Sequence, residues 1–296
     1  MVSLKEFEKH YLKKIDLAEI EILISFVIGK PREFILTHLE YNLSKLEENK
    51  LKKLVKKRLA GEPIAYLIGE KEFYGLNFRV NKNVLVPRPE TELMVEKTLN
   101  LIKTIYFIDP KKLITVIDIG TGSGCIIIAL AKFLLHNFPA LKFYAIDISL
   151  RSLVIAKINA QLYNIHNKIK FFHGNLLQPL INNSEYFQNS FTVITANLPY
   201  LTPKQIKNSP TIQTEPRLAL DGGYDGLKYY RQLIQQLKKP PFANLSWAAF
   251  FEIDPTQETK IKKIIKKKLI GRQIKSYPDL AGYTRVIEIR KLSNPL

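Results

Sequence analysis

Hydrophobic positions recur at two different spacings along the chain. In the first 70 residues, apolar side chains lie three or four places apart, as in Phe7, Tyr11 and Ile15, and this spacing predicts helices. A second helix is expected to begin at Asp16 and to end at Gly29, and a third is expected over residues 43–59. The expected buried stripe of the second helix is Ile20, Ile22, Leu23, Phe26 and Val27.

Beyond the helical segment, the pattern changes to one of strands. Alternating apolar residues flank a turn at Gly75, which predicts a β-hairpin over residues 72–81. From residue 113 onward, strand-like and helix-like runs alternate, which predicts a mostly parallel sheet with helices on both faces. The expected strands are 114–119, 141–146, 168–172, 191–196, 248–253, one near 273 and 285–289, and the expected helices are 123–135, 150–164, 226–238 and 257–268.

The composition fits a folded protein of about two domains. The chain has 296 residues, of which 46% are hydrophobic, and domains average about 150 residues. Its apolar runs are far shorter than the roughly 20 residues of a membrane span. Glu and Lys stand near the N-terminus, where a secretory signal would be apolar. The single cysteine, Cys125, excludes an internal disulfide. We therefore expect a cytoplasmic protein.

The net charge is strongly positive and has two interpretations. Lys and Arg number 45 against 27 Asp and Glu, which gives +18. Such a balance favours acidic partners, nucleic acid above all. A composition biased toward Lys, Ile and Asn would produce the same charge without any such partner. The lysine runs at 51–58 and 260–268 are most simply solvated helix faces, and the alternative is that they steer an acidic or RNA-bound partner.

A glycine-rich turn is the first candidate for chemistry. The strand over 114–119 leads into Gly120, Gly122 and Gly124, and a helix follows. Asp118 precedes the first glycine by two residues, so the turn suits a dinucleotide pyrophosphate poorly. A carboxylate at this position suits a ligand with a cationic amino group, at the strand end where open α/β sheets bind ligands. The alternative is an ordinary turn between a strand and a helix.

A second acid follows at the end of the next strand. Asp147 lies about 20 residues beyond the glycines, where an acidic side chain can accept hydrogen bonds from both hydroxyls of a ribose. Together with the glycine turn, it describes a pocket for an adenosine ligand that carries a charged amino-acid end, and S-adenosylmethionine fits that description. The alternative for Asp147 is a helix N-cap, which is compatible with ligand binding.

The third candidate is the segment Asn197-Leu198-Pro199-Tyr200, which follows the strand over 191–196. It is expected at the same sheet edge as the glycine turn. The Asn carboxamide and the adjacent carbonyl groups can accept hydrogen bonds from an –NH₂ group, and Tyr200 offers a flat face. This set suits methylation of an amide or of a base amine. The alternative is a simple Asn-x-Pro turn.

These motifs together resemble class I S-adenosylmethionine-dependent methyltransferases of the N-methylating group. Further segments resemble the family of release-factor glutamine methyltransferases (PrmC/HemK), and they lie at 61–69, 73–75, 86–92, 215–223, 225–227 and 279–282. The resemblance covers about residues 60 to 290. It implies an α/β, Rossmann-like class I methyltransferase fold with a mostly parallel seven-stranded sheet, an N-terminal helical bundle and a linking β-hairpin.

The resemblance also implies an activity and a set of site residues. The activity is N5-methylation of the glutamine in the Gly-Gly-Gln motif of class-1 peptide-chain release factors. The cofactor, S-adenosylmethionine, is then held by Asp118, Gly120, Thr121, Gly122, Ser123, Gly124, Asp147, Asn175, Leu176 and Asn197. The substrate glutamine is held by Asn197, Leu198, Pro199 and Tyr200, of which Asn197, Pro199 and Tyr200 serve catalysis. Arg88 and Glu90 are expected to order a loop over the site.

The expected organisation has three parts. Residues 1–70 form a helical bundle that docks the substrate protein, residues 71–86 form the hairpin linker, and residues 87–296 form the methyltransferase domain. We expect a monomer that needs neither a metal nor a membrane. Nucleic acid is not required for the activity, although the basic charge leaves it open as a partner.

Three departures from the family pattern keep two other functions open. Leu198 stands where the family usually has proline, Asn175-Leu176 replaces an Asp-aromatic pair, and Asp254 stands where glycine is common. Asn-Leu-Pro-Tyr is also the form of this motif in ribosomal RNA adenine dimethyltransferases. The first alternative is therefore a nucleic-acid adenine N6-methyltransferase. The second is a non-catalytic RNA- or ribosome-binding factor.

Overall fold

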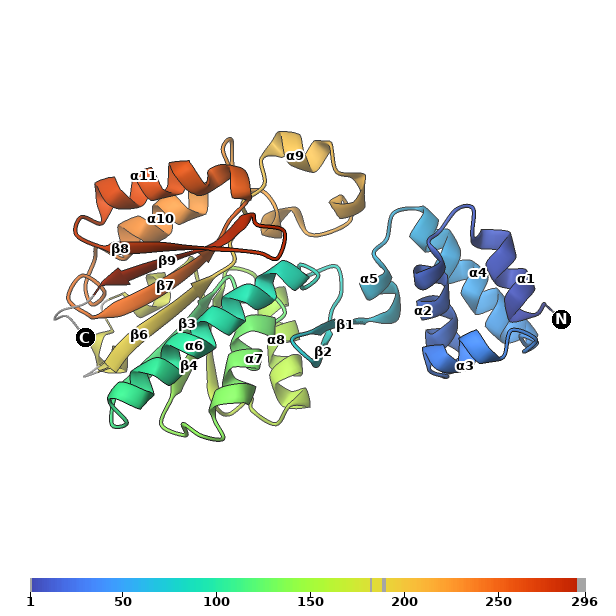
Figure 1. Ribbon diagram of the computed structural model, residues 1–296, viewed down its shortest axis with the longest axis horizontal. Coiled ribbons are helices and arrows are strands. Elements are labelled where there is room, and N and C mark those ends of the chain that lie inside the picture. Colours follow the sequence, from blue (N-terminus) through green and yellow to red (C-terminus); the bar gives the residue numbers. More distant parts are fainter. Residues whose placement is uncertain (1, 182, 188–189, 292–296) are drawn as a thin grey trace. The chain divides into compact units, whose positions relative to one another are not determined.

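The computed structural model describes residues 2–181, 183–187 and 190–291 (Figure 1). The chain divides into two compact units. The first contains residues 1–70 and 209–214, and the second contains residues 71–208 and 215–296. In the part of the chain that the structure describes, no helix combines the length and the apolar character needed to cross a membrane.

The first unit is helical, as the spacing of its apolar residues predicts. Ser3 and Ser44 open helices with reciprocal capping boxes, and Asp16 caps another by accepting a hydrogen bond from the Ala18 N–H. The helices are α1 (Leu4–Tyr11), α2 (Leu17–Ile28), α3 (Arg32–Thr37), α4 (Lys45–Leu59) and α5 (Ile64–Ile68). Of these, α3 and α5 are absent from the predicted elements.

The buried face of α2 differs from the predicted stripe. Ile20 and Leu23 are fully buried as expected, and so is Ile24, which was not expected. Ile22 and Phe26 are 39% and 42% exposed, so their predicted burial is wrong. Nearly every residue of α2 is apolar, so periodicity alone does not identify one face. The neighbouring helices decide which side of α2 joins the core.

The predicted hairpin is confirmed as the first two strands, β1 (Glu70–Phe73) and β2 (Leu76–Arg79). The two turn residues, Tyr74 and Gly75, have positive φ angles of 53° and 72°. Such angles belong to the primed turns whose twist matches that of the flanking strands. From Lys71 onward, the hairpin belongs to the second unit.

The second unit contains a seven-stranded sheet with the order β5-β4-β3-β6-β7-β9-β8. The first five of these strands run parallel, and β9 is antiparallel to both β7 and β8. The strands are β3 (Leu113–Ile119), β4 (Lys142–Asp147), β5 (Ile169–His173), β6 (Ser190–Ala196), β7 (Trp247–Glu252), β8 (Gln273–Pro278) and β9 (Thr284–Lys291). The predicted mostly parallel, seven-stranded sheet is therefore confirmed.

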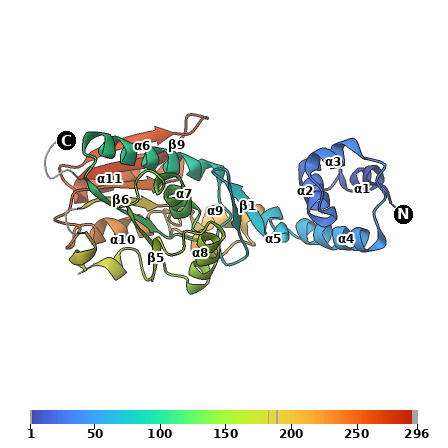
Figure 2. The same cartoon turned by 90° about the horizontal axis from the view of Figure 1, so that it is seen from below.

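Helices cover both faces of this sheet (Figures 1 and 2). One face carries α7 and α8, and α6 packs on the same side. The opposite face carries α10 and α11. The helices of this unit are α6 (Glu92–Ile108), α7 (Cys125–Leu134), α8 (Leu150–Leu162), α9 (Pro203–Lys207), α10 (Lys228–Gln236) and α11 (Glu258–Lys268).

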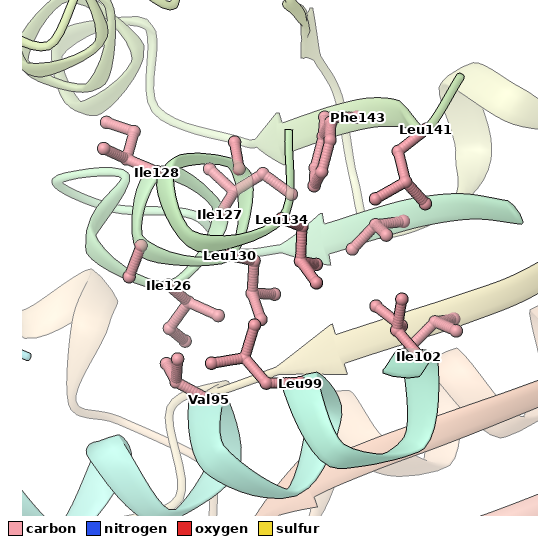
Figure 3. Close-up of a cluster of buried hydrophobic side chains, with 14 of the residues drawn as sticks. Val95, Leu99, Ile102, Ile126, Ile127, Ile128, Leu130, Leu134, Leu141 and Phe143 are labelled. Atoms are coloured by element: carbon pink, nitrogen blue, oxygen red, sulfur yellow. The ribbon is translucent and has the colours of Figure 1, made fainter. Parts of the chain in front are cut away.

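Two hydrophobic cores result, because successive strand residues point to opposite faces. Ile114 and Val116 of β3 join the core with α6 and α7, whereas Ile117 and Ile119 join the core with α10 and α11. Figure 3 shows the first core, in which Val95, Leu99 and Ile102 of α6 face the apolar side of α7.

Helix α6 is absent from the predicted elements, although its sequence carries the required signal. Its buried residues include Met94, Val95, Leu99, Ile102 and Ile105, which recur at helical spacing. The helical spacing of these apolar residues therefore makes α6 predictable from the sequence. Helix α9 has five residues and none of them is buried, so its sequence carries no comparable apolar stripe.

Candidate active site

A cavity of about 300 Å³ lies at the carboxyl end of the parallel strands, lined by the loops that follow β3, β4, β5 and β6. Cavities at this edge are the usual ligand sites of open α/β sheets. The cavity brings together most of the predicted site residues, namely Gly120, Thr121, Gly122, Ser123, Asp147, Asn175, Leu176, Asn197, Leu198 and Pro199. Asp118, Gly124 and Tyr200 are not among its lining residues.

Asp118 is fully buried beneath the glycine turn. Its Oδ2 accepts a hydrogen bond of 2.7 Å from the Thr121 hydroxyl, and its Oδ1 accepts one of 2.8 Å from the Thr195 hydroxyl. Burial raises the pKa of Asp118 to about 6, against the lowering effect of the two hydroxyls. Asp118 is therefore buried by its two hydroxyl partners and is not among the residues that line the cavity. The carboxylate instead fixes the side chain of Thr121, which does line the cavity.

Gly124 has a packing role rather than a lining one. It precedes α7 with a φ of +81°, and a Cβ atom there would lie 2.8 Å from Ile128 Cδ1 and 3.2 Å from the Ala156 Cβ. Only glycine allows α7 and α8 to approach so closely at this point. The third glycine of the turn thus holds the helices that carry the site.

Asp147 reaches across to the glycine turn and lines the cavity. Its Oδ2 accepts a hydrogen bond of 2.9 Å from the Gly122 N–H, and its Oδ1 accepts one of 2.8 Å from the Ser149 N–H. The N-cap of α8 is Ser149, so Asp147 is not that cap. Burial raises the pKa of Asp147. Each carboxylate oxygen has two lone pairs, so acceptor capacity remains for a ligand.

The turn after β5 brings Asn175 and Leu176 to the cavity. Leu176 has a φ of +55°, a strained value for a residue with a branched side chain. Gln236 of α10 holds this turn from behind. Its Oε1 accepts a hydrogen bond of 2.7 Å from the Leu177 N–H, and its Nε2 donates one of 3.3 Å to the Asn175 carbonyl.

The loop after β6 places Asn197 and Leu198 on the cavity wall. Asn197 Nδ2 donates a hydrogen bond of 3.1 Å to the Thr91 hydroxyl oxygen. The Leu198 N–H donates one of 3.3 Å to the Tyr230 hydroxyl oxygen. Proline has no N–H, so leucine at position 198 gives the loop an anchor that the usual family residue lacks. This bond offsets the flexibility that leucine would otherwise introduce.

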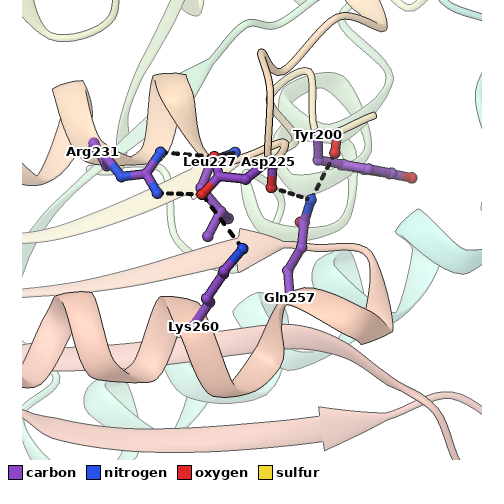
Figure 4. A network of polar contacts seen from close by, with 6 residues as sticks. All are labelled: Tyr200, Asp225, Leu227, Arg231, Gln257 and Lys260. Carbon is purple, nitrogen blue, oxygen red and sulfur yellow. Dashed lines mark hydrogen bonds and ion pairs between the residues drawn. The ribbon is translucent and has the colours of Figure 1, made fainter. Parts of the chain in front are cut away.

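Tyr200 anchors the same loop rather than lining the cavity. Its hydroxyl donates a hydrogen bond of 3.4 Å to Glu252 Oε1, and its carbonyl accepts one of 2.7 Å from Gln257 Nε2. Figure 4 shows Gln257 between Tyr200 and Asp225, with Arg231 paired to Asp225. Burial raises the pKa of Tyr200, so its hydroxyl is neutral. The expected flat face for the substrate is therefore absent from the cavity lining.

Several lining residues were not predicted. They are Lys82, Asn83, Val84, Leu85, Pro87, Thr91, Ile119, Cys125, Ile126, Ile148, Ser149, Arg151, Ser152, Gly174, Pro216, Leu218, Ala219 and Tyr229. Arg88 also lines the cavity and pairs with Glu215, whose Oε2 accepts a hydrogen bond of 3.0 Å from the Val86 N–H. Residues 86–92 and 215–223 both resemble the family motifs, so this resemblance could have identified the two segments as parts of the site.

Among the described residues, no three His, Cys, Asp or Glu side chains gather as metal ligands would. Cys125 lines the cavity, but burial raises the pKa of its thiol to about 12, so it is not a thiolate nucleophile.

Two family models match the chain. The PrmC N-terminal domain matches residues 5–69, and a methyltransferase domain matches residues 110–268. The release factor glutamine methyltransferase of Dictyoglomus turgidum is 36% identical over 92% of this chain and 90% of that protein. The enzyme of the same name from Coxiella burnetii is 34% identical over 98% of this chain and 100% of that protein.

A longer relative and two solved structures are also similar. A bifunctional methyltransferase of Rickettsia prowazekii is 34% identical over 93% of this chain, which spans about half (53%) of that protein. The human METTL16 catalytic domain with an RNA hairpin matches at a TM-score of 0.55 and 16% identity, over 90% of this chain and 91% of that one. The human METTL16 N-terminal domain in complex with SAH matches at a TM-score of 0.53 and 17% identity, over 92% of this chain and 94% of that one. At such identities, these two structures inform on the fold alone.

Proposed function

The chain belongs to the release factor glutamine methyltransferase family, and from that premise we propose that it methylates N5 of the glutamine in the Gly-Gly-Gln motif of class-1 peptide-chain release factors. The observation that carries this proposal is the position of the Asn197–Tyr200 loop. Asn197 and Leu198 of this loop line one cavity together with the glycine turn and Asp147.

The cavity fits S-adenosylmethionine. The carboxylate of Asp147 offers acceptors for ribose hydroxyls, and Leu176 and Leu198 offer apolar walls. The volume of about 300 Å³ matches the lower end of small-molecule sites. We assign binding of S-adenosylmethionine to Gly120, Thr121, Gly122, Ser123, Asp147, Asn175 and Leu176. Asp118 supports the site by holding the Thr121 side chain, and Gly124 supports it by allowing α7 and α8 to pack closely. When bound, S-adenosylmethionine supplies a methyl group activated by a positively charged sulfur.

The loop residues orient the substrate amide. A glutamine amide nitrogen is a poor nucleophile, because its lone pair is delocalised into the carbonyl group. Asn197 Nδ2 is engaged by Thr91, which leaves Oδ1 to accept one N–H of the substrate. The Pro199 carbonyl packs against Gly222, and that of Tyr200 binds Gln257. We therefore assign the second N–H to the Leu198 carbonyl.

Two acceptors on one –NH₂ group do more than bind it. They fix the direction of the nitrogen lone pair, and they stabilise the positive charge that grows on nitrogen as the new bond forms. Alignment of this kind is worth about 7–11 kcal/mol in favourable cases. Catalysis by this chain thus rests on orientation and electrostatics, without a strong base in contact with the nitrogen.

We assign protein docking to residues 1–70. The match to the PrmC N-terminal domain supports this role. The bundle has its own hydrophobic core, so its surface is available for a separate task. Ile22 and Phe26 of α2 are part-exposed apolar side chains of the kind that protein partners cover.

The decisive experiment is transfer of a labelled methyl group from S-adenosylmethionine. Purified release factor, the same factor with the Gly-Gly-Gln glutamine changed to Ala, and ribosomal RNA are offered in parallel. We expect label on the first substrate only. Label on RNA alone would support the adenine methyltransferase alternative, and absence of S-adenosylmethionine binding would support the non-catalytic one.

A further inference from the structure

One face of α8 holds the main chain of the segment that leads from the hairpin into the cavity (Figure 1). Three side chains of α8 and its C-cap donate hydrogen bonds to carbonyl groups of this segment, and the pairs are Ser152 with Asn83 (3.0 Å), Asn159 with Arg79 (3.0 Å) and Tyr163 with Asn77 (2.8 Å). The three donors are seven and four residues apart, close to two turns and one turn of a helix, so they share one face.

Asn159 makes a further connection, to the glycine turn. It is fully buried, and its Nδ2 also donates a hydrogen bond of 2.8 Å to the Ser123 carbonyl. Its Oδ1 accepts one of 2.7 Å from the Arg79 N–H. One carboxamide therefore pairs both main-chain groups of Arg79, as a neighbouring strand would, and joins them to the turn between β3 and α7.

The Asn159 amide has only one workable orientation. Both of its N–H groups face carbonyl oxygens, and its oxygen faces an N–H group. The reversed amide would place its oxygen against two carbonyl oxygens and leave buried groups unpaired, which is costly. The close approach of α7 to Ala156, on the same face of α8, brings this carboxamide to the glycine turn.

Both segments that Asn159 connects continue into the cavity wall. Ser123 lines the cavity on one side, and residues 82–85 line it from the segment that follows Arg79. The far end of that segment is held by Glu215, which accepts a hydrogen bond of 3.0 Å from the Val86 N–H. The two walls are about 40 positions apart in sequence, so their separation depends on contacts such as those of Asn159.

We propose that Asn159 is a positioning residue for S-adenosylmethionine, which fixes the wall formed by residues 82–85 relative to the glycine turn. This inference rests on the proposed function for the identity of the cofactor. Asn159 does not line the cavity, so it acts through the two segments that it joins. A wall displaced by about 1 Å would lose contacts along the whole ligand.

The first test measures S-adenosylmethionine binding to Asn159→Leu by calorimetry. Leucine is similar in size to asparagine and has no hydrogen-bonding group, so the variant removes all three bonds. We expect the dissociation constant to rise about 10- to 100-fold. The values of kcat at saturating S-adenosylmethionine and of KM for the release factor should change less than about 3-fold, because the Asn197–Tyr200 loop has no bond to Asn159.

Tyr163→Phe is the matched control. It also removes a hydrogen bond from α8 to a hairpin carbonyl, but the acceptor, Asn77, does not line the cavity. Its dissociation constant for S-adenosylmethionine should stay within about 2-fold of the wild-type value. Asn159→Ser carries the test if Asn159→Leu does not fold, because a smaller polar side chain leaves room for water at the freed groups.

A second measurement uses the protein without cofactor. Amide hydrogen exchange at Arg79 should be faster in Asn159→Leu than in the wild type, since this N–H loses its acceptor. Tyr163→Phe should leave exchange at Arg79 unchanged. This readout reports the connection itself, whatever the reaction that follows.

The outcomes are distinguishable. A folded Asn159→Leu or Asn159→Ser with the wild-type dissociation constant would overturn the inference. An equal rise in Tyr163→Phe would also overturn it, because the effect would then belong to the hairpin as a whole. A wild-type protein that binds S-adenosylmethionine but labels no release factor would instead reject the proposed function.

Discussion

Asn197 and Asp147 both line the cavity, but their hydrogen bonds commit them to different tasks. Asn197 uses Nδ2 on Thr91 and keeps Oδ1 for the substrate. Asp147 uses its carboxylate on the glycine turn and on the entry to α8, and it keeps lone pairs for ribose hydroxyls. At the scale of residues, we propose on this basis that Asn197 serves catalysis and that Asp147 serves cofactor binding.

Asn197→Ala tests the catalytic task. We expect a fall in kcat of roughly 100- to 1,000-fold, because a preorganised acceptor is lost at the reacting nitrogen. S-adenosylmethionine affinity, measured by calorimetry on the same variant, should stay within about 2-fold. Equal losses of kcat and of affinity would show that Asn197 serves the cofactor instead.

Asp147→Ala tests the cofactor task. The loss of charge-assisted hydrogen bonds to ribose is expected to weaken S-adenosylmethionine binding by about 100-fold or more. Asp109→Ala is the control, because Asp109 also accepts a hydrogen bond from the N–H two residues on, but it does not line the cavity. An unchanged dissociation constant in Asp147→Ala would reject the ribose assignment.

At the scale of elements, the Asn197–Tyr200 loop is held in place by a second loop, residues 221–226. Gly226 in this loop has a φ of +72°, and a Cβ atom there would lie 2.0 Å from both the Tyr200 carbonyl oxygen and Gln257 Nε2. Asp225 pairs with Arg231 and Lys260, which fixes the second loop on α10 and α11 (Figure 4). The shape of the Asn197–Tyr200 loop therefore depends on the close approach of the Gly226 backbone as well as on hydrogen bonds.

Gly226→Ala should disturb both stability and activity. We expect a loss of about 3 kcal/mol in the free energy of unfolding, from the left-handed backbone and from the overpacked Tyr200 carbonyl. Gly271→Ala is the matched control, because Gly271 has a similar φ of +74° and no atom near a Cβ. It should lose about 1 kcal/mol and keep full kcat. Chemical denaturation and the methyl-transfer assay measure the two effects, and equal losses in both variants would contradict the role of close approach.

At the scale of the whole molecule, the positive charge is unevenly distributed. Residues 1–70 contain 13 Lys and Arg against 11 Asp and Glu, so they contribute +2 of the +18. The second unit carries the remaining +16. Any long-range attraction of an acidic partner therefore acts mainly on the methyltransferase unit.

The two units have separate hydrophobic cores, so a ligand of one should not stabilise the other. S-adenosylmethionine at 100 times its dissociation constant should raise the stability of the second unit by about 2.7 kcal/mol. Amide hydrogen exchange in β3 and β4 should slow accordingly, while exchange in α2 and α4 stays unchanged. Slower exchange in both units would show that they open together.

The pattern of apolar residues along the chain is enough to predict the sheet and the edge at which the cavity lies. Alternating strand and helix patterns identify β3, β4 and β6, and the carboxyl ends of parallel strands meet at one edge. Asp147 ends β4 and Asn197 directly follows β6, so their local context predicts that both lie at this edge, and both line the cavity. Helix α6 was also within reach of the same reasoning, since its apolar residues recur at helical spacing.

Which side chains face the cavity and which support it from behind depends on contacts between distant parts of the chain. Asp118 and Tyr200 are not among the lining residues, and each is held by a partner far along the chain. Asp118 accepts a hydrogen bond from the Thr195 hydroxyl, and the Tyr200 hydroxyl donates one to Glu252. Thr91 reaches Asn197 across 106 positions of sequence. Local periodicity holds no information on such partners, because side-chain direction at a loop is set by what the rest of the fold packs against it.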